Sequence, residues 1–299
     1  MPNIERLTST WPLLLVALAL AAAGALATPA AADAAPDWAE FEQASIQPGV
    51  QMVTEGGQCT ANFVFTDGAD ILLGYSAHCA GTGEATSTNG CEAATHPTGT
   101  PVEIEGATQP GTLTYSSWET MQQRGEGDLD TCQFNDFALV TLHPDDHGAV
   151  NPTIPFWGGP DALGSSTAEL EKVYTYGNSS LRLGIDLLKP KEGYSLGQTA
   201  SGWNHPVYTA TPGIPGDSGS AFLDGAGAAV GSLSTLAIAP LAGSNGVTDL
   251  ALALDYANTH GGVSAQLATG TEPFGGGLVL PDLTPGDDSS SSGSLLGLH

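Results

Sequence analysis

The sequence is short of positive charge. Of its 299 residues only 6 are Lys or Arg, against 32 Asp or Glu, so the formal net charge at pH 7 is −26. Proteins that bind nucleic acid or anionic membranes need basic surfaces, and this balance argues against both kinds of partner. Because copies of so acidic a chain repel one another, we expect a monomer.

Charged residues of both signs make up only 13% of the chain, whereas glycine occurs 40 times and proline 20 times. This composition disfavours long surface helices with many charge pairs and favours short elements joined by turns. The 41% of hydrophobic residues is enough to fill a sizeable core, which excludes a disordered protein. We therefore expect an all-β fold.

A long apolar run stands near the N-terminus. Residues 11–27 read WPLLLVALALAAAGALA, after Arg6 and before small residues that continue to Ala32. This order is typical of a secretory signal peptide, which we assign to residues 1–32. A retained membrane anchor is the alternative, because the run is near the lower length limit for crossing a bilayer. We expect a secreted, extracellular protein that has no membrane contact once the signal is removed.

Cysteines are few, but their number is even. In an exported chain four cysteines predict two disulfides, for which three pairings are possible. Metal binding is the weaker interpretation, because no Cys-x-x-Cys spacing occurs and the close pair His143 and His147 stands around a proline in a turn-like sequence. We expect no metal and no other cofactor. The four cysteines are Cys59, Cys79, Cys91 and Cys132.

Short apolar runs separated by Gly, Pro or Asp predict strands along most of the chain. The runs 63–65 and 71–73 flank TDGAD, whose Asp-Gly pair predicts a β-hairpin. Of the apolar segments, DLALALDYANTHG at 249–261 alone suits a helix. From residue 275 to 299 the chain is rich in Gly, Ser and Asp, and we expect a flexible tail there. Further runs begin at Phe137, Lys172, Ser220 and Ala228.

The segment GIPGDSGS surrounds Ser218 with turn-forming residues. A serine hydroxyl attacks carbonyl groups when a histidine removes its proton and a carboxylate orients that histidine. Suitable contexts are GYSAHCA around His78 and NDFALV around Asp136. The glycines beside Asp217 and Ser218 allow a tight turn in which the N–H groups of Gly216 and Ser218 converge, as an oxyanion hole requires.

These three segments resemble, in the same order, the histidine, aspartate and serine motifs of the chymotrypsin-like serine proteases. The similarity extends over residues 49–261, and the short hairpin before His78 is more similar to the secreted bacterial branch. The resemblance implies a serine endopeptidase acting on polypeptides, with His78 as general base, Asp136 orienting it and Ser218 as nucleophile.

The resemblance also implies the architecture. We expect two six-stranded antiparallel β-barrels and a short C-terminal helix. The protease domain would cover residues 33–274, with the barrels divided near residues 150–170. A disulfide between Cys59 and Cys79 around the histidine loop is implied as well, which leaves Cys91 to pair with Cys132.

By analogy with the family, the substrate pocket involves Pro212, Gly213, Ser234 and Thr235. None of these residues is acidic. Because a buried Lys or Arg side chain would meet no counter-charge there, we expect small or medium apolar side chains before the cleaved bond.

The animal members of the family are activated by a cut after a basic residue, and the new amino terminus pairs with the acid before the serine. This chain has no Lys or Arg between Arg6 and Arg124, so such a cut is not available. Asp217 must therefore stay unpaired, pair with an internal group or await some other cut, and we expect a basic partner because an unpaired buried carboxylate would be costly. Arg182 falls in the region from which secreted bacterial relatives supply an internal arginine, and we predict an Arg182–Asp217 ion pair.

The other basic residues have less suitable surroundings. Arg124 stands in the polar stretch QQRGEGD, and Lys189 and Lys191 flank a proline in a sequence typical of an exposed loop. Four other histidines lack a comparable context, and we expect them to be surface or structural residues. They are His96, His143, His205 and His260.

Two other functions compete with a protease. An esterase of the α/β-hydrolase class would use Ser218, Asp249 and His260 in that order, but it needs Gly-x-Ser-x-Gly, and residue 220 is Ser. A secreted binding module on a protease-like fold is the second alternative. The intact serine, histidine and aspartate motifs argue against it.

Overall fold

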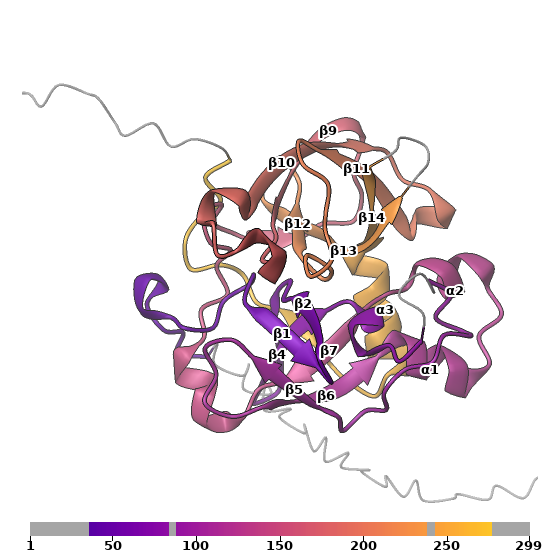
Figure 1. Cartoon of the computed structure of the whole chain (residues 1–299), viewed down its shortest axis with the longest axis horizontal. Coiled ribbons are helices and arrows are strands. Elements are labelled where there is room, and N and C mark those ends of the chain that lie inside the picture. Colours follow the sequence, from indigo (N-terminus) through magenta and orange to yellow (C-terminus); the bar gives the residue numbers. More distant parts are fainter. Residues whose placement is uncertain (1–35, 84–87, 238–242, 277–299) are drawn as a thin grey trace, which may run out of the picture. The chain divides into compact units, whose positions relative to one another are not determined.

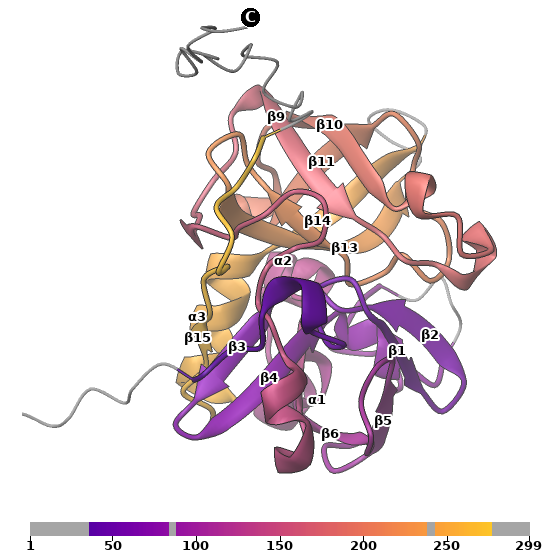
Figure 2. The ribbon, with the colours of Figure 1, turned by 90° about the vertical axis from the view of Figure 1, so that its left-hand side faces the viewer.

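The computed structural model describes residues 36–83, 88–237 and 243–276. The expected signal peptide lies outside the described residues, as do residues 277–299 of the expected tail. Within the described ranges, every helix is too short or too polar to cross a bilayer. Two antiparallel sheets account for most of the secondary structure, and Figures 1 and 2 show them as separate halves with α3 beside both.

The first sheet has eight strands in the order β15-β3-β4-β7-β6-β5-β1-β2. It has two strands more than the six expected, and its edge strands are β2 and β15, which follows α3. The strands are β1 (Gln51–Thr54), β2 (Gly57–Thr60), β3 (Val64–Asp67), β4 (Asp70–Tyr75), β5 (Pro101–Ile104), β6 (Gly111–Ser116), β7 (Ala138–Thr141) and β15 (Gln266–Leu267).

The second sheet closes on itself. Its order is β12-β9-β10-β11-β14-β13-β8, and β12 also pairs with β13, so six strands form a closed antiparallel barrel with β8 added in parallel. The all-β fold is thus confirmed. The strands are β8 (Ala162–Leu163), β9 (Glu169–Tyr176), β10 (Pro190–Leu196), β11 (Asn204–Thr209), β12 (Ala221–Leu223), β13 (Ala228–Ala237) and β14 (Ser244–Asp249).

The expected C-terminal helix is α3 (Leu250–His260). It begins where the Asp249 carboxylate accepts the Leu252 N–H, a normal helix cap, and it contacts α1 and β13, one from each half. The sequence analysis missed two short helices, α1 (Ser117–Arg124) and α2 (Leu129–Phe134). The 3₁₀ turns are η1 (Phe41–Gln43), η2 (Ala77–Ala80), η3 (Pro144–Ala149), η4 (Ser180–Arg182), η5 (Asp186–Leu188) and η6 (Ala200–Gly202).

The predicted hairpin is formed by β3 and β4. Val64 pairs with Leu73 and Asp67 with Asp70, so the turn is Gly68 and Ala69, with Gly68 at φ 59°. A positive φ at this position is easily adopted by glycine and explains the Asp-Gly signal. The chain leaves β4 directly into η2, which carries His78.

The core of the first sheet fixes the segment that carries Asp136. Phe137 is fully buried, and its ring lies 5.7 Å from that of Phe65 and 6.3 Å from that of Tyr115. The first pair meets edge-on and the second is tilted, and aromatic pairs at these distances are among the larger contributors to core packing. The residue after Asp136 therefore acts as an anchor, and Asp136 itself is held at the start of β7.

Two disulfides brace the loops of the first half, in the pairing that the resemblance implies. Cys59 in β2 is joined to Cys79 in η2, with their Cα atoms 6.1 Å apart. Cys91 is joined to Cys132 in α2, with a Cα separation of 5.2 Å. The first bridge is adjacent to His78, and the second lies a few residues before Asp136.

Candidate active site

His78 and Asp136 are in direct contact. The Asp136 carboxylate accepts the His78 backbone N–H at 2.8 Å and pairs with Nδ1 of the ring at 2.6 Å. Because an ionised carboxylate only accepts, we assign the ring proton to Nδ1, which leaves Nε2 unprotonated. The His78 side chain is 25% exposed and that of Asp136 only 4%, so the imidazole can reach solvent while the carboxylate is shielded.

Ser234 completes the surroundings of Asp136. Its hydroxyl donates to Asp136 Oδ2 at 2.5 Å. The sequence analysis assigned Ser234 to the substrate pocket, but the structure directs its hydroxyl to the carboxylate. Asp136 therefore receives three hydrogen bonds, two from His78 and one from Ser234, and these fix the orientation of the carboxylate and of the His78 ring.

The pKa values of this pair move in opposite directions. Burial alone would lower the pKa of His78, but the charge of Asp136 and the hydrogen bond to it hold the pKa above the ordinary value of 6.5. Burial would raise the pKa of Asp136, but the charge of His78 and the hydrogen bonds from His78 and Ser234 keep it below 3.8. The arrangement stabilises a histidine cation next to an ionised aspartate.

Ser218 lies where the two halves of the structure meet. Its carbonyl accepts the Thr60 N–H of β2 at 2.8 Å, and the next N–H, of Gly219, donates to Leu233 of β13 at 2.7 Å. A Cβ atom on Gly219 would collide with the Thr60 carbonyl and lie 3.2 Å from Ser76 N, two residues before His78. The Ser218 hydroxyl is part-exposed and makes no hydrogen bond within the described residues.

Gly216 forms the bend before the serine, with φ +95°. Its carbonyl accepts hydrogen bonds from Thr60 Oγ1 at 2.7 Å and from Gln58 Nε2 at 3.0 Å. A Cβ atom here would collide with Gln58 Oε1. The positive φ and this close approach together require glycine.

The Pro215–Gly216 peptide is oriented by a side chain from a distant segment. The Pro215 carbonyl accepts the Ser179 hydroxyl at 2.5 Å. Because the C=O and N–H of a trans peptide point in opposite directions, the Gly216 N–H is turned away from Ser179. Within the described residues neither this N–H nor that of Ser218 has an acceptor, so both can bind an oxyanion.

Three residues that hold this turn were missed from the sequence, namely Gln58, Thr60 and Ser179. They are 36 to 158 residues away from the atoms they contact, and no local motif marks them.

Asp217 is fully buried and is paired with Arg182, as the sequence predicted. The guanidinium binds both carboxylate oxygens, Oδ1 through Nε at 3.2 Å and Oδ2 through a terminal nitrogen. The N–H groups of Ser179 and Ile214 also donate to this carboxylate, at 3.1 and 3.2 Å. Burial would raise the pKa of Asp217, but the hydrogen bonds and charges of its cationic partners keep it below 3.8.

Lys191 is a second cation at the same carboxylate. Its Nζ lies 2.7 Å from Asp217 Oδ2, and its side chain is 5% exposed. The expectation of an exposed loop here was wrong, because Pro190 opens strand β10, whose pairing with β9 turns Lys191 inward. Burial lowers the pKa of Lys191 below 10.5, and the charge of Asp217 offsets this only in part. Lys189 instead pairs with Asp186 at 2.9 Å.

The space beside Gly213, in the expected pocket segment, is limited by residues of the second barrel. The Gly213 N–H donates to Oδ1 of buried Asn245 at 2.8 Å. A Cβ atom on Gly213 would lie 2.8 Å from Leu233 and 3.1 Å from Asn245 Oδ1. The space beside Gly213 is thus already filled, whereas Pro212 is exposed and Thr235 is half-buried in β13.

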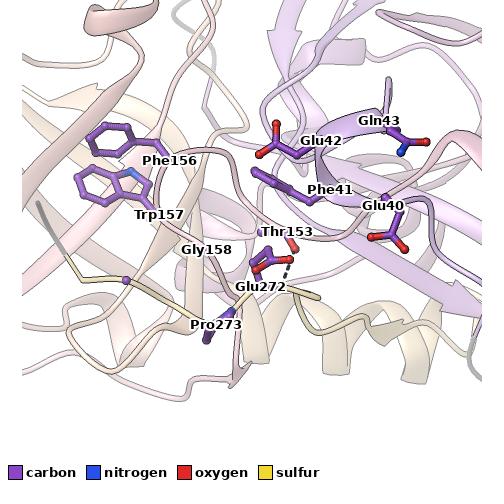
Figure 3. A pocket seen from close by; sticks show the side chains of 11 residues that line it. Glu40, Phe41, Glu42, Gln43, Thr153, Phe156, Trp157, Gly158, Glu272 and Pro273 are labelled. Carbon is purple, nitrogen blue, oxygen red and sulfur yellow. Dashed lines mark hydrogen bonds between the residues drawn. The ribbon is translucent and has the colours of Figure 1, made fainter. Parts of the chain in front are cut away.

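A cavity of about 510 Å³ lies elsewhere, among η1, the connection between the two sheets and the C-terminal segment. Figure 3 shows Phe156 and Trp157 on one side of it and Phe41 and Glu42 on the other. Its lining lacks serine, histidine and cysteine, so it offers no nucleophile with a base. The lining residues are Glu40, Phe41, Glu42, Gln43, Thr153, Phe156, Trp157, Gly158, Glu272, Pro273 and Gly275.

The competing assignments find little support in the described residues. Asp249, which the esterase alternative needs, is bound by His205 at 2.8 Å and caps α3. His205 is fully buried, which identifies it as a structural residue. The one cluster of metal-ligand types found among the described residues is Cys59, His78 and Cys79, and its two sulfurs are joined in a disulfide.

The structure thus brings the Ser218 turn against β2 and β13, and it pairs His78 with Asp136 in the first half. No family model and no curated protein sequence matches the chain. Solved structures that resemble it are bacterial chymotrypsin-like serine proteases at low sequence identity.

Three of these structures illustrate the similarity. Thermobifida fusca protease A is 16% identical, with a TM-score of 0.46 over 75% of this chain and 99% of that one. Nocardiopsis protease is 17% identical, with a TM-score of 0.43 over 74% and 98%. Cellulomonas bogoriensis chymotrypsin is 15% identical, with a TM-score of 0.43 over 75% and 99%.

Proposed function

We propose that the protein is a serine endopeptidase that hydrolyses peptide bonds through an acyl-enzyme. The observation that carries the proposal is the His78–Asp136 pair together with the turn at Ser218, whose two N–H groups have no acceptor within the described residues. The two are linked through β2, because Ser218 accepts the Thr60 N–H and the neighbouring Cys59 is joined to Cys79. This combination supplies a base, a nucleophile and an oxyanion site.

In the first step His78 Nε2 takes the proton of the Ser218 hydroxyl as Oγ attacks the substrate carbonyl carbon. The carbonyl oxygen becomes an oxyanion, which the N–H groups of Gly216 and Ser218 stabilise. The His78 cation is stabilised by Asp136 and then gives its proton to the leaving amine as the C–N bond breaks. The hydrogen bond between a nucleophile and its base often forms only when substrate is bound, which accounts for the unbonded Ser218 hydroxyl.

In the second step water attacks the ester carbon of the acyl-enzyme while His78 takes a proton from it. The same two N–H groups hold the second oxyanion. Its collapse returns the proton to Ser218 Oγ and releases the new carboxylate. The residues named here need no cofactor for either step.

A fluorophosphonate probe tests the proposal directly, because it reacts with an activated serine. We expect the probe to label Ser218 in the folded protein, as located by peptide mass spectrometry, and we expect peptides to be cleaved. An unlabelled protein would be a binding module, and a labelled protein that cleaves lipid esters but no peptides would be an esterase.

We propose export and an extracellular location for the mature chain, with a protease domain of residues 33–274. The two disulfides support this, because they persist in oxidising compartments. Mass spectrometry of the exported protein would check signal removal, since the loss of residues 1–32 lowers the mass of the chain by a known amount.

We expect the enzyme to prefer small or medium apolar side chains before the cleaved bond. Leu233 and Asn245 fill the space beside Gly213, and none of the four residues assigned to the pocket is acidic, so a cation would meet no counter-charge from them. Profiling with a peptide library would measure the preference. Selective cleavage after Arg or Lys would contradict both the position and the depth assigned to the pocket.

Activity should depend on pH through His78. Only the neutral ring can act as base, and its pKa lies above 6.5, so kcat/KM should fall as the pH drops through this raised value. We expect the pH profile of kcat/KM to show an acid limb, that is, a decrease at low pH that follows the binding of one proton. In Asp136→Asn the charge that raises the pKa is gone, and the limb should move to lower pH. An unmoved limb would assign it to another group.

The two cations at Asp217 predict a second pH effect. In Arg182→Gln the carboxylate depends on Lys191, whose proton is lost at high pH, so activity should gain an alkaline limb. Lys191→Met keeps Arg182, which stays charged, and should show no new limb. Both variants should keep neutral-pH activity within about tenfold, because one cation still pairs with Asp217. Identical alkaline profiles for the two variants would refute the shared pairing.

A further inference from the structure

An exposed apolar patch lies on residues 181–188, which we call the apolar loop. Its five large hydrophobic side chains all reach solvent, with exposed fractions of 62% for Leu181, 84% for Leu183, 48% for Ile185, 87% for Leu187 and 42% for Leu188. Single exposed leucines are common, but an apolar cluster of this density on a soluble protein usually marks a binding surface.

The apolar loop is held in a defined conformation. It contains η4 and η5, and backbone hydrogen bonds of 3.0 Å join Ile185 to Arg182 and Leu188 to Ile185. Leu183 has φ +54°, a left-handed conformation that leucine rarely adopts. The buried Arg182 side chain, bound to Asp217, fixes the centre of η4. The leucines on either side of Arg182 are therefore presented to solvent by a rigid support.

The apolar loop also adjoins the turn before Ser218. Ser179, just ahead of η4, donates through its hydroxyl to the Pro215 carbonyl at 2.5 Å. The Ser180 N–H donates to Gln58 Oε1 at 2.9 Å, and Gln58 Nε2 donates to the Gly216 carbonyl at 3.0 Å. One continuous set of contacts thus runs from the apolar loop to the oxyanion turn.

These contacts place the apolar loop on one side of the cleaved bond. The leaving amine receives its proton from His78, so the leaving segment passes the His78 side of Ser218. His78 is followed by Cys79, which forms a disulfide with Cys59. The residue before Cys59 is Gln58, whose side chain accepts the Ser180 N–H. Gly213, in the segment assigned to the acyl side of the substrate, packs instead against Leu233 of β13. The apolar loop therefore borders the path of the leaving segment.

We propose that the apolar loop binds bulky apolar side chains of the polypeptide on the carboxyl side of the cleaved bond. This inference rests on the proposed function and adds a substrate class to it, namely polypeptides with apolar residues soon after the cleavage point. The net charge of −26 disfavours an anionic membrane or a second copy of the chain as the occupant. An extended apolar peptide segment meets no such repulsion and continues the same cleft.

The test compares two kinds of substrate. One is succinyl-Ala-Ala-Pro-Ala p-nitroanilide, whose leaving group ends at the cleaved bond. The other is a pair of internally quenched peptides in which Ala-Ala-Pro-Ala is followed by Ser-Leu-Leu or by Ser-Ser-Ser. The unchanged protein should cleave the Ser-Leu-Leu peptide with a kcat/KM about tenfold above that for the Ser-Ser-Ser peptide. The double variant Leu183→Asn/Leu187→Ser should lose this preference and keep its rate on the p-nitroanilide.

Leu170→Asn is the matched control. Leu170 is also exposed, at 71%, and also has a positive φ of 64°, but it lies at the far end of β9 from Ser179. It should leave all three rates unchanged. Asn tolerates the left-handed conformation better than Leu, so neither asparagine substitution should harm folding.

Each remaining outcome overturns the proposal in a distinct way. Equal losses on the p-nitroanilide and on the peptides would mean that the apolar loop supports the oxyanion turn only. A dimer that becomes a monomer in the double variant, or binding to phosphatidylcholine vesicles that the variant loses, would assign the loop to those partners. An unchanged protein that takes no fluorophosphonate and cleaves none of the substrates would refute the proposed function, and this inference with it.

Discussion

Ser218→Ala should reduce kcat/KM by about five to six orders of magnitude, because the acyl-enzyme cannot form without the attacking oxygen. The residual rate over water would come from the oxyanion site and from substrate binding. The loss should appear in kcat, with little change in KM, as measured on the best substrate of a peptide library.

Folding should survive this substitution, since the Ser218 hydroxyl makes no hydrogen bond within the described residues. Circular dichroism and the thermal midpoint check this. Ser264→Ala, at an exposed serine between α3 and β15, is the matched control and should keep full activity. A Ser218→Ala variant within tenfold of the unchanged protein would exclude the serine mechanism.

Asp136→Asn should lower kcat by about four orders of magnitude. The amide can donate where the carboxylate only accepts, so it favours the wrong ring tautomer of His78 and no longer stabilises the cation. The contact at 2.6 Å and the shielding of Asp136 make the effect large, because solvent cannot replace the lost charge.

Ser234→Ala separates orientation from charge in the same site. It removes the hydroxyl that donates to Asp136 at 2.5 Å but leaves the carboxylate ionised. Its loss of kcat should be much smaller than that of Asp136→Asn. If the two variants lose equal activity, the carboxylate acts through its position alone and the electrostatic account of Asp136 is wrong.

The parts of the candidate site that the sequence could suggest are those whose evidence is local. Ser218, with glycines on either side of the Asp-Ser pair, and His78 beside a cysteine stand in short segments whose chemistry can be recognised without the fold. The β3–β4 hairpin was predictable for the same reason, because Gly68 needs its positive φ within the turn itself.

Lys191 shows why other parts were not predictable. The proline before it suggested a loop, yet the strand pairing of β10 with β9 buries its side chain and brings it to Asp217. Burial of this kind depends on neighbours far away in the sequence, which override the local signal. Ser179 and Gln58, which hold the oxyanion turn, are ordinary polar residues until the two halves meet.

The short helices were hidden by their length. α1 has eight residues and a polar composition, and it ends at Gly125 in the left-handed conformation, so its sequence resembles a polar loop with a turn. An isolated helix of this length is unstable, and packing decides whether it forms. Trp118 and Met121, buried on its inner face, provide that packing.

The burial of Arg182 and Lys191 against Asp217 also changes what other proteases can do to this protein. The sequence after Arg6 has five Lys or Arg residues, and the structure withdraws these two from the surface. Three basic residues remain. Arg124 ends helix α1, Lys172 lies within strand β9, and Lys189 forms an ion pair with Asp186. An attacking enzyme needs an exposed and locally unfolded segment, so digestion specific for basic residues finds few points of entry. The pairing that fixes the turn before Ser218 thus also removes two basic residues from the reach of such enzymes.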